Sequence, residues 1–392
     1  MQPTPRDAVY DTYWRFAAER HEIFLRRARG EPAPWTEDPI LGRYKFCNTF
    51  RAADRVSQYL IREVIYGPST TELAPEDVFL RIVLFRLFSK ESTWEALEQV
   101  TGGVTRATIG DERVGAALDS LKSRQSIYTA AFILADPSAF GHRAKHRNHL
   151  ALVSSMFRPG GLGVELSRAR TLREIYDALV RHPGIGPFLG YQITVDLNYT
   201  EHIDFAENEF TVAGPGALRG LQKVFRDLGG RSPEQLILGM VERQQDEFAR
   251  LGLEFRGLFG RRLHAIDCQS LFCETDKYSR QAFPELKSNR VRIKQEFKPS
   301  QAPLPLFFPP KWALGDALRG RGRSDGANLD DQLTLDEGSL QLVHSRDDRD
   351  RPGIGRGEYK RPVRGAASER RAYRPGYDFS EQPANAAGGR SG

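Results

Sequence analysis

Three carboxylates that could take part in catalysis lie close together near the middle of the sequence. Asp204 and Glu207 belong to the acidic segment HIDFAENEF (202–210), and Asp196 precedes it. When a glycosidic bond is broken, a carboxylate can stabilise positive charge on the sugar and can orient or deprotonate a water molecule. Acidic loops are more often simply solvated, so these residue types alone do not establish catalysis.

The elements that must position these carboxylates are two predicted helices joined by a tight glycine turn. Thr171 and Glu174 mark the start of the first helix, because a threonine N-cap with a glutamate three residues later forms a capping box. This helix ends before Pro183, because proline disfavours a helical residue in front of it. The second helix begins at Pro187, where a missing N–H group costs nothing. The turn consists of Pro183, Gly184, Ile185 and Gly186.

A turn of this composition can hold a phosphate group. Glycines leave successive backbone N–H groups exposed, and the N-terminus of the following helix adds partial positive charge. Together they form a nest for a phosphate oxygen, which positions DNA without reading its sequence. The same turn is also compatible with an ordinary connection between two helices.

The segment 171–199 resembles the helix-hairpin-helix element of DNA glycosylases. In that family the catalytic Asp lies beyond the hairpin, and Asp204 follows Gly184 at the matching distance of 20 positions. The resemblance therefore implies that Asp204 is the first candidate for catalysis and Glu207 the second. Bifunctional members carry a nucleophilic Lys where this sequence has Phe188. The resemblance thus implies a monofunctional enzyme that uses water.

Five ordered segments resemble a more specific family. They are PWTEDPIL (34–41), YKFCNTFRAADRVSQYL (44–60), GPFLGYQITVDLNY (186–199), ENEFTVAGPGALRGL (207–221) and CETDKYSR (273–280). Together they resemble the α-glutamyl/putrescinyl thymine pyrophosphorylase family, also called the helical domain of 5-hydroxymethyl-deoxyuridine DNA kinases. The resemblance covers roughly residues 5–295. It implies a role with hypermodified pyrimidines in phage DNA and a fold similar to that of the DNA glycosylases.

The residues and these resemblances together imply three groups of site residues. The catalytic candidates are Asp204, Glu207 and Asp196, the last of which lies one helical turn after Gln192. The residues expected to contact the DNA backbone are Pro183, Gly184, Ile185, Gly186, Gly214, Gly216, Arg219 and Arg51. The residues expected to recognise a base are Phe46, Asn48, Tyr191, Gln192, Asp276 and Lys277.

The predicted roles in base recognition have a chemical basis, but core packing and ion pairing are alternative roles for the same residues. The amides of Asn48 and Gln192 can pair with a base edge, and an aromatic ring such as Phe46 or Tyr191 can stack on an extruded base. Aromatic residues on helices are more often part of the core. The neighbours Asp54-Arg55 and Asp276-Lys277 are equally compatible with ion pairs that stabilise the fold.

Composition narrows the class of protein. The chain has 392 residues, of which 40% are hydrophobic, and its formal net charge of +6 permits nucleic-acid binding without demonstrating it. No run approaches the roughly 20 apolar residues that span a bilayer, and the N-terminus lacks a secretory signal, so we expect a cytoplasmic protein. The three cysteines form no recognisable framework, and His146 and His264 have no ligand-like partners nearby in sequence. We therefore expect no metal and no cofactor.

Helical periodicity predicts an all-α fold over residues 1–312. The resemblance to the helix-hairpin-helix DNA glycosylases implies that this fold is two-lobed and of their type. Helices are expected at 6–28, 50–65, 76–90, 91–100, 111–123, 145–158, 171–181, 187–199, 215–228, 232–250 and 263–281, with 76–90 buried. The segment 126–134 is ambiguous between helix and strand. Residues 313–392 are rich in Arg and Gly and poor in large aliphatic residues, so we expect a disordered tail.

Three functions are compatible with these features. The first is a monofunctional DNA glycosylase that excises a hypermodified pyrimidine from phage DNA, as a defence against phage. The second is a transferase that replaces pyrophosphate on 5-hydroxymethyl-pyrimidine in DNA with an amino acid or putrescine. Its phosphorylated substrate would come from another protein, because the sequence has no Gly-x-x-x-x-Gly-Lys-Ser/Thr loop. The third is a non-catalytic reader of modified DNA. In each case the expected partner is double-stranded DNA with modified bases, with no membrane and no obligatory protein partner.

Overall fold

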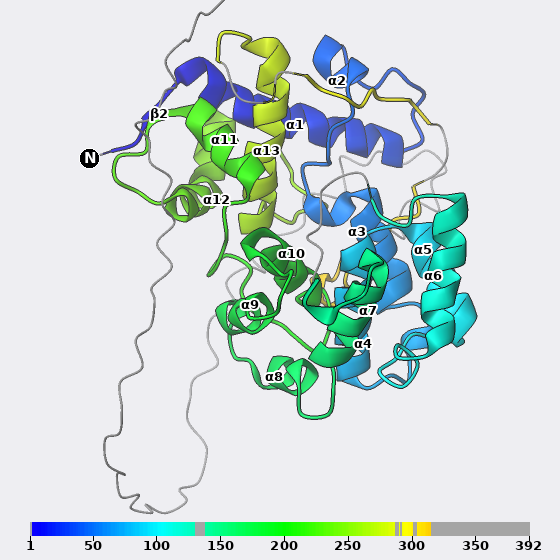
Figure 1. Cartoon of the computed structure of the whole chain (residues 1–392). Helices are drawn as coiled ribbons and strands as arrows, with labels where there is room; N and C mark the ends of the chain where they lie inside the picture. Colours follow the sequence, from blue (N-terminus) through cyan, green and yellow to red (C-terminus); the bar gives the residue numbers. More distant parts are fainter. Residues whose placement is uncertain (1, 130–137, 287–289, 291, 301–303, 315–392) are drawn as a thin grey trace, which may run out of the picture. The chain divides into compact units, whose positions relative to one another are not determined.

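Helices account for nearly all of the regular structure (Figure 1), which confirms the predicted all-α fold. This computed structural model describes residues 2–129, 138–286, 290, 292–300 and 304–314. All of them belong to the compact unit that residues 1–326 form. Residues 315–392 of the predicted tail and residues 130–134 of the ambiguous segment lie outside this description. The two-lobed arrangement stays a prediction.

The elements along the chain are α-helices of 5 to 22 residues, a few short helices of other types and two short strands. The α-helices are α1 (Asp7–Ala28), α2 (Pro39–Arg43), α3 (Arg55–Tyr59), α4 (Pro75–Phe88), α5 (Glu91–Thr101), α6 (Glu112–Arg124), α7 (Lys145–Met156), α8 (Leu162–Arg168), α9 (Leu172–Val180), α10 (Pro187–Leu197), α11 (Pro215–Val224), α12 (Pro233–Arg250) and α13 (Ala265–Ala282). The 3-10 helices are η1 (Arg51–Ala53), η3 (Pro68–Thr70), η4 (Ser138–Phe140) and η5 (Pro310–Trp312), and η2 (Leu60–Ile65) is a π-helix. Strands β1 (Thr4–Pro5) and β2 (Phe225–Asp227) pair in antiparallel orientation.

Helix boundaries around the glycine turn follow the capping signals. Thr171 Oγ1 accepts the N–H of Glu174 at 3.1 Å, and α9 ends at Val180. The Glu174 side chain accepts the N–H of Arg170 at 2.7 Å, so only the threonine half of the predicted capping box forms. The next helix, α10, begins at Pro187 as predicted.

Other boundaries differ from the prediction for local reasons. The helices α2 and α8 have only 5 and 7 residues, too few to produce a periodic pattern. The predicted helix 50–65 is divided into η1, α3 and η2. The break between η1 and α3 arises because Asp54 has an extended backbone with ψ = 144°. The predicted helix 215–228 stops at Val224, because the following residues form β2 and pair with β1.

Helix α4 lies in the middle of the core, and every residue from Val78 to Phe88 is buried, which confirms the predicted buried helix. Two of these residues are arginines. Arg81 Nη1 lies 2.7 Å from Glu98 Oε1, and Arg86 is paired with a carboxylate of α10. A buried charge is strongly destabilising unless it is paired. Core packing and ion pairing together therefore fix α4 against its neighbours.

Candidate functional site

The turn between α9 and α10 lies at the surface. Gly184 has φ = 81°, a left-handed conformation that favours glycine. Gly186 is exposed, and a Cβ built there would meet no atom within 4 Å. Ile185, between them, is 3% exposed and anchors the turn in the core. The turn is therefore rigidly held and accessible, as a phosphate contact requires, and the contact itself stays a prediction.

The acidic segment 202–210 is attached to both helices that flank this turn. Asn198 directly follows α10, and its side chain donates to the carbonyl of Phe205 and accepts the Phe205 N–H, both at 3.0 Å. Near the other end of the segment, Glu209 Oε1 accepts the N–H of Leu172 at the start of α9, at 3.2 Å. The turn and the carboxylates are thus parts of one connected unit.

Asp204 is the most accessible of the three catalytic candidates. Its side chain is 79% exposed, and its Oδ1 lies 3.1 Å from Lys311 Nζ. Lys311 also donates to the carbonyl of Ile203 at 2.7 Å, which fixes the ammonium group beside the carboxylate. Burial lowers the pKa of Lys311, an effect that Asp204 opposes. A substrate could reach Asp204 without displacing other side chains.

Glu207 is partly enclosed by a basic and an aromatic side chain. It forms an ion pair with Arg261, and its side chain is only 18% exposed. The guanidinium carbon of Arg261 lies 3.7 Å from the centre of the Trp312 ring. Glu207 therefore helps to pack this loop against η5. As a candidate for catalysis it ranks below Asp204.

Asp196 lies in the interior between two arginines. Arg86 contacts both of its oxygens, Nε at 2.5 Å and Nη2 at 2.9 Å, and Arg51 Nη1 lies 2.9 Å from Oδ1. The Asp196 side chain is fully buried. Because both oxygens are occupied and no solvent reaches them, the predicted catalytic role of Asp196 is not supported. Its position is that of a structural ion pair.

Arg51, the partner of Asp196, is also buried and does not reach the surface. Its Nε donates to Gln192 Oε1 at 2.9 Å, and its Nη1 donates to the Tyr199 hydroxyl at 3.0 Å. Burial lowers the pKa of Arg51, but the charges and hydrogen bonds of Asp196 and Tyr199 together outweigh it and hold the pKa above its usual range. The predicted phosphate contact of Arg51 is therefore not supported. Gln192 is only partly buried, and its predicted base contact stays a prediction.

The two aromatic candidates are core residues. Tyr191 is 1% exposed, and its ring packs edge-on against Phe210 with the centroids 5.9 Å apart. Phe46 is 7% exposed and packs against Phe16 with the centroids 5.3 Å apart. Both positions agree with the core alternative rather than with stacking on an extruded base.

Helix packing accounts for the second glycine turn. A Cβ on Gly216 would overlap Cys273 Sγ, and one on Gly214 would lie 2.5 Å from Phe188 Cδ2. These glycines let α11 approach its neighbours, so no phosphate is needed to explain them. Arg219 Nε lies 3.3 Å from a carboxylate oxygen of Asp276 instead of facing solvent freely. The predicted DNA contacts of this turn stay predictions.

Asp276 is fully buried and carries three basic neighbours. Arg219, Lys223 and Arg280 lie 3.3, 3.2 and 2.6 Å from its oxygens. Burial raises the pKa of Asp276, but Arg280 and Lys223 outweigh it, so the pKa lies below its ordinary value. These contacts favour the ion-pair alternative over base recognition, although Lys277 is not the partner.

Two motifs that are distant in the sequence meet beside α13. Glu274 Oε2 accepts the N–H of Cys47 at 3.0 Å, across 227 residues of sequence. The same oxygen lies 3.3 Å from Lys277 Nζ, and this ammonium group lies 4.6 Å from the centre of the Phe46 ring. Lys277 thus faces Phe46 as well as a carboxylate, and a direct role in base recognition stays a prediction.

The loop that contains Asn48 holds a carboxyl group with unusual basicity. Asp54 Oδ1 accepts the Asn48 N–H at 2.7 Å, while Asn48 Nδ2 donates to the carbonyl of Ala53 at 2.6 Å. Burial raises the pKa of Asp54 to about 6, although the Asn48 N–H and the charge of Arg20 lower it. The amide nitrogen of Asn48 is bound to the backbone, and the predicted base contact of this residue stays a prediction. Arg55 faces Glu91 at 3.5 Å rather than Asp54.

Comparison with known proteins assigns the family. A model of the family described as "5-hmdU DNA kinase, helical domain" matches residues 7–288. The chain belongs to this family. It is 26% identical to the 5-hmdU DNA kinase of Bacillus phage SP10 over 294 residues, which cover 70% of this chain and 46% of the phage protein. The chain therefore spans about half the length of that relative. No solved structure matches it.

The region that matches the 5-hmdU DNA kinase helical domain includes the glycine turn and both converging motifs, but it ends before Lys311. The ion-pair partner of Asp204 therefore lies outside it. Two residues inside it were missed by the sequence analysis. Glu274 gave no signal beyond its membership of the C-terminal motif, and Arg20 lies among the many other charges of α1.

Neither a membrane-spanning helix nor a metal-binding cluster occurs in the described part of the chain. There, no helix combines the length and the apolar character needed to cross a membrane. The same residues contain no cluster of three or more His, Cys, Asp and Glu side chains arranged to bind a metal ion. His146 instead contacts Asp119, with Nε2 2.7 Å from Oδ1.

Proposed function

We propose that this protein is a monofunctional DNA glycosylase that excises a hypermodified pyrimidine, such as a glycosylated 5-hydroxymethyl-pyrimidine, from phage DNA as a defence against phage. The observation that carries the proposal is the attachment of the segment 202–210, with its accessible Asp204, to both helices of the glycine turn. DNA held at that turn would lie on the same unit as the carboxylate. Family membership supports the substrate class, because the relative in phage SP10 is named for its action on 5-hmdU in DNA.

In the proposed reaction the target nucleotide is first extruded from the duplex. Water attacks C1′ of the deoxyribose, the bond from C1′ to the base nitrogen breaks, and the base leaves with the bonding electrons and takes up a proton. Asp204 stabilises positive charge on the sugar and accepts the proton of the attacking water. Lys311, 3.1 Å away, orients the carboxylate for this step.

The test is release of free base from phage DNA that contains modified pyrimidines, with unmodified DNA alongside. We expect free modified base and alkali-sensitive abasic sites from the modified DNA alone. Asp204→Asn should reduce the rate by roughly a hundredfold or more. Asp246→Asn, which changes an exposed carboxylate on α12, should leave it unchanged. Modified DNA that yields no free base would refute the proposal.

The basicity of Asp54 favours a second candidate function, the transferase. A carboxylate with a pKa of about 6 suits a general base near neutral pH. In that reaction an amine nitrogen would attack the exocyclic methylene carbon of the pyrimidine, the bond from this carbon to the pyrophosphate oxygen would break, and Asp54 would take the amine proton. A heavier nucleoside after addition of an amine to pyrophosphorylated DNA, without abasic sites, would establish this activity. DNA that is bound but unchanged would indicate a reader.

A further inference from the structure

Arg20, on α1, is a buried cation with an unused hydrogen-bond donor. The residue is 8% exposed, and its Nη1 has no hydrogen-bond partner among the described residues. A guanidinium group stays protonated in proteins, so this position keeps its charge. A buried donor without a partner costs free energy, and a buried charge without a counterion costs more. Such an arrangement is explained if a ligand supplies the missing partner.

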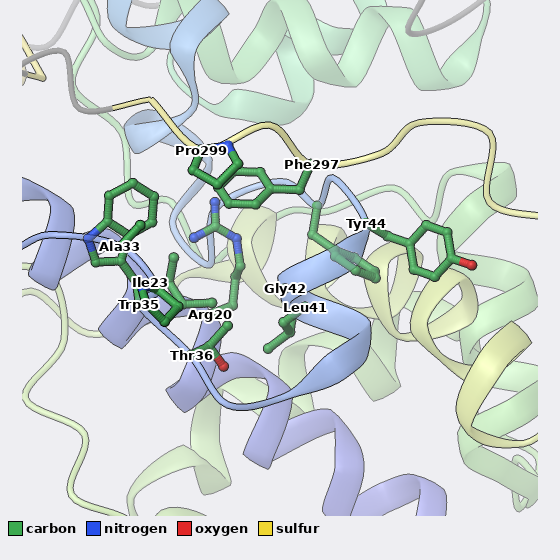
Figure 2. A pocket seen from close by; sticks show the side chains of 12 residues that line it. Arg20, Ile23, Ala33, Trp35, Thr36, Leu41, Gly42, Tyr44, Phe297 and Pro299 are labelled. Atoms are coloured by element: carbon green, nitrogen blue, oxygen red, sulfur yellow. The ribbon is translucent and has the colours of Figure 1, made fainter.

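The guanidinium of Arg20 faces a small cavity. Its volume is about 60 Å³. Figure 2 shows Arg20 reaching from α1 toward Phe297, with Trp35 beside it. The lining residues are Arg20, Ile23, Ala33, Pro34, Trp35, Thr36, Leu41, Gly42, Tyr44, Phe46, Phe297 and Pro299. Most of this lining is apolar, so an ion inside would be held by few polar groups, with Arg20 foremost.

Pairing between two chain segments closes one side of this cavity. Lys45 donates its N–H to the carbonyl of Gln295 at 3.1 Å, and Phe297 donates to the carbonyl of Arg43 at 2.8 Å. Trp35 is 3% exposed and packs edge-on against Phe297, with the centroids 6.3 Å apart. The cavity is therefore a preformed feature rather than a gap between loops.

The carboxylates nearest to Arg20 already have partners. Asp54 accepts the Asn48 N–H, and Glu274 accepts the Cys47 N–H and pairs with Lys277. Their charges favour the protonated form of Arg20, but burial outweighs them and lowers its pKa. Positive charge at the cavity is thus incompletely balanced.

We propose that this cavity is a binding site for a small oxyanion, a carboxylate or a phosphate group, held by Arg20. A guanidinium pairs with either group through two parallel hydrogen bonds. The volume is too small for an extruded base, because even a benzene-sized ligand occupies a cavity of roughly 150 Å³. The anion is either free in solution or the head group of a larger molecule. This site is separate from Asp204 and does not depend on the excision reaction.

The test is a titration of the full chain with inorganic phosphate and, separately, with acetate, followed by tryptophan fluorescence. Trp35 lines the cavity, so we expect a saturable change that Trp35→Phe abolishes. Arg20→Gln should weaken binding by roughly ten- to a hundredfold, the loss of a charge-assisted pair. Arg27→Gln is the matched control, because Arg27 does not line the cavity, and it should bind nearly as the wild type does.

A second variant keeps the test decisive if Arg20→Gln fails to fold. Gly42 lines the cavity, and a Cβ built there has no atom within 4 Å, so Gly42→Leu should fold and obstruct binding. Response to phosphate alone, to acetate alone or to both would identify the head group. Competition by duplex DNA would identify a DNA phosphate as its source, and its absence a small molecule. No saturable response to either anion in the wild type, or wild-type affinity in both Arg20→Gln and Gly42→Leu, would overturn the proposal.

Discussion

Arg51 Nη1 lies 2.9 Å from Asp196 Oδ1, and this buried pair joins the loop before α3 to the helix after the glycine turn. Arg86 of α4 contacts the same carboxylate, and the backbone N–H of Arg51 donates to Asp267 Oδ1 at 2.8 Å. Two carboxylates, Asp196 and Asp267, therefore tie the segment around Arg51 to α4, α10 and the start of α13. Arg51 and Asp196, which the sequence presents as DNA-binding and catalytic candidates, form a buried ion pair that stabilises the fold.

Substitution of Asp196 should affect stability more than any change at Asp204. In Asp196→Asn, the side chain keeps its shape but leaves two buried guanidinium groups without a counterion. We expect a loss of about 3–5 kcal/mol in the free energy of unfolding, measured by urea denaturation. Asp204→Asn should cost less than about 1 kcal/mol, because its ion pair is exposed. Equal losses in the two variants would contradict this division of roles.

The glycines of α11 should be sensitive to a methyl group, and the glycine of the surface turn should not. A Cβ on Gly220 would overlap the carbonyl oxygen of Phe272, which is backbone and cannot rotate away. We expect Gly220→Ala to lower the free energy of unfolding by about 1–3 kcal/mol or more. Gly186→Ala, with open space around it and φ = −78°, should change it by less than about 1 kcal/mol. Thermal unfolding of both variants measures the two changes. An unchanged stability of Gly220→Ala would show that α11 and α13 can move apart.

Local signals predicted the part of the fold in which short-range chemistry decides the outcome. Thr171 and Pro187 placed the ends of α9 and α10, because capping and proline geometry act within a few residues. The division of 50–65 was not predictable in this way. It depends on Asp54, whose extended backbone is fixed by contacts with Asn48 and by burial.

The site was harder to predict, because residue type does not reveal burial. Arg51 and Asp196 carry groups suited to DNA, yet they bind one another in the interior, and Arg51 also donates to the partly buried Gln192. Glu274 and Arg20 gave no signal of their own, because their partners lie far away in the sequence or are absent from the described residues. Only the tertiary arrangement separates the accessible carboxylate of Asp204 from the buried ones.

A negative charge on the glycine turn should weaken DNA binding without unfolding the protein. Gly186→Glu places a carboxylate at an exposed position whose backbone has room for it, where it would repel a phosphate. We expect duplex affinity, measured by fluorescence anisotropy, to fall by roughly tenfold at low salt, with a smaller difference at high salt. Gly110→Glu is the control, because this exposed glycine lies on another loop with its nearest neighbouring atom at 4.0 Å. Equal loss in both variants would show that only net charge matters.

Asp54 should make stability depend on pH between about 4 and 6. Its pKa is about 6 in the folded protein and 3.8 for the free group, so the folded state binds more protons in this range. The free energy of unfolding should therefore fall as pH rises through it, by about 2 kcal/mol, and then level off. In Asp54→Asn this contribution disappears, and urea denaturation at pH 4.5 and 7 should show a smaller difference than in the wild type. An unchanged or larger difference would mean that Asp54 is ionised throughout.

Lys311 should act on excision only through Asp204. Its ammonium group lies 3.1 Å from the Asp204 carboxylate and is also bound to the carbonyl of Ile203, so it fixes the orientation of the carboxylate. We expect Lys311→Met, which keeps the length of the side chain, to lower the single-turnover rate by roughly tenfold. It should also alter the dependence of that rate on pH, because a charge beside the reacting carboxylate is lost. A merely structural role would leave the pH profile of the rate unchanged.

The double variant decides whether the two residues act as a unit. If Lys311 works by orienting Asp204, adding Lys311→Met to Asp204→Asn should cause little further loss, because effects of residues that act together are not additive. If the fold-reductions in rate of the two single variants multiply in the double variant, Lys311 contacts the DNA independently of Asp204. Lys311→Arg keeps the charge and should restore part of the rate. Restoration by Arg in the Asp204→Asn background as well would rule out orientation of the carboxylate as the role of Lys311.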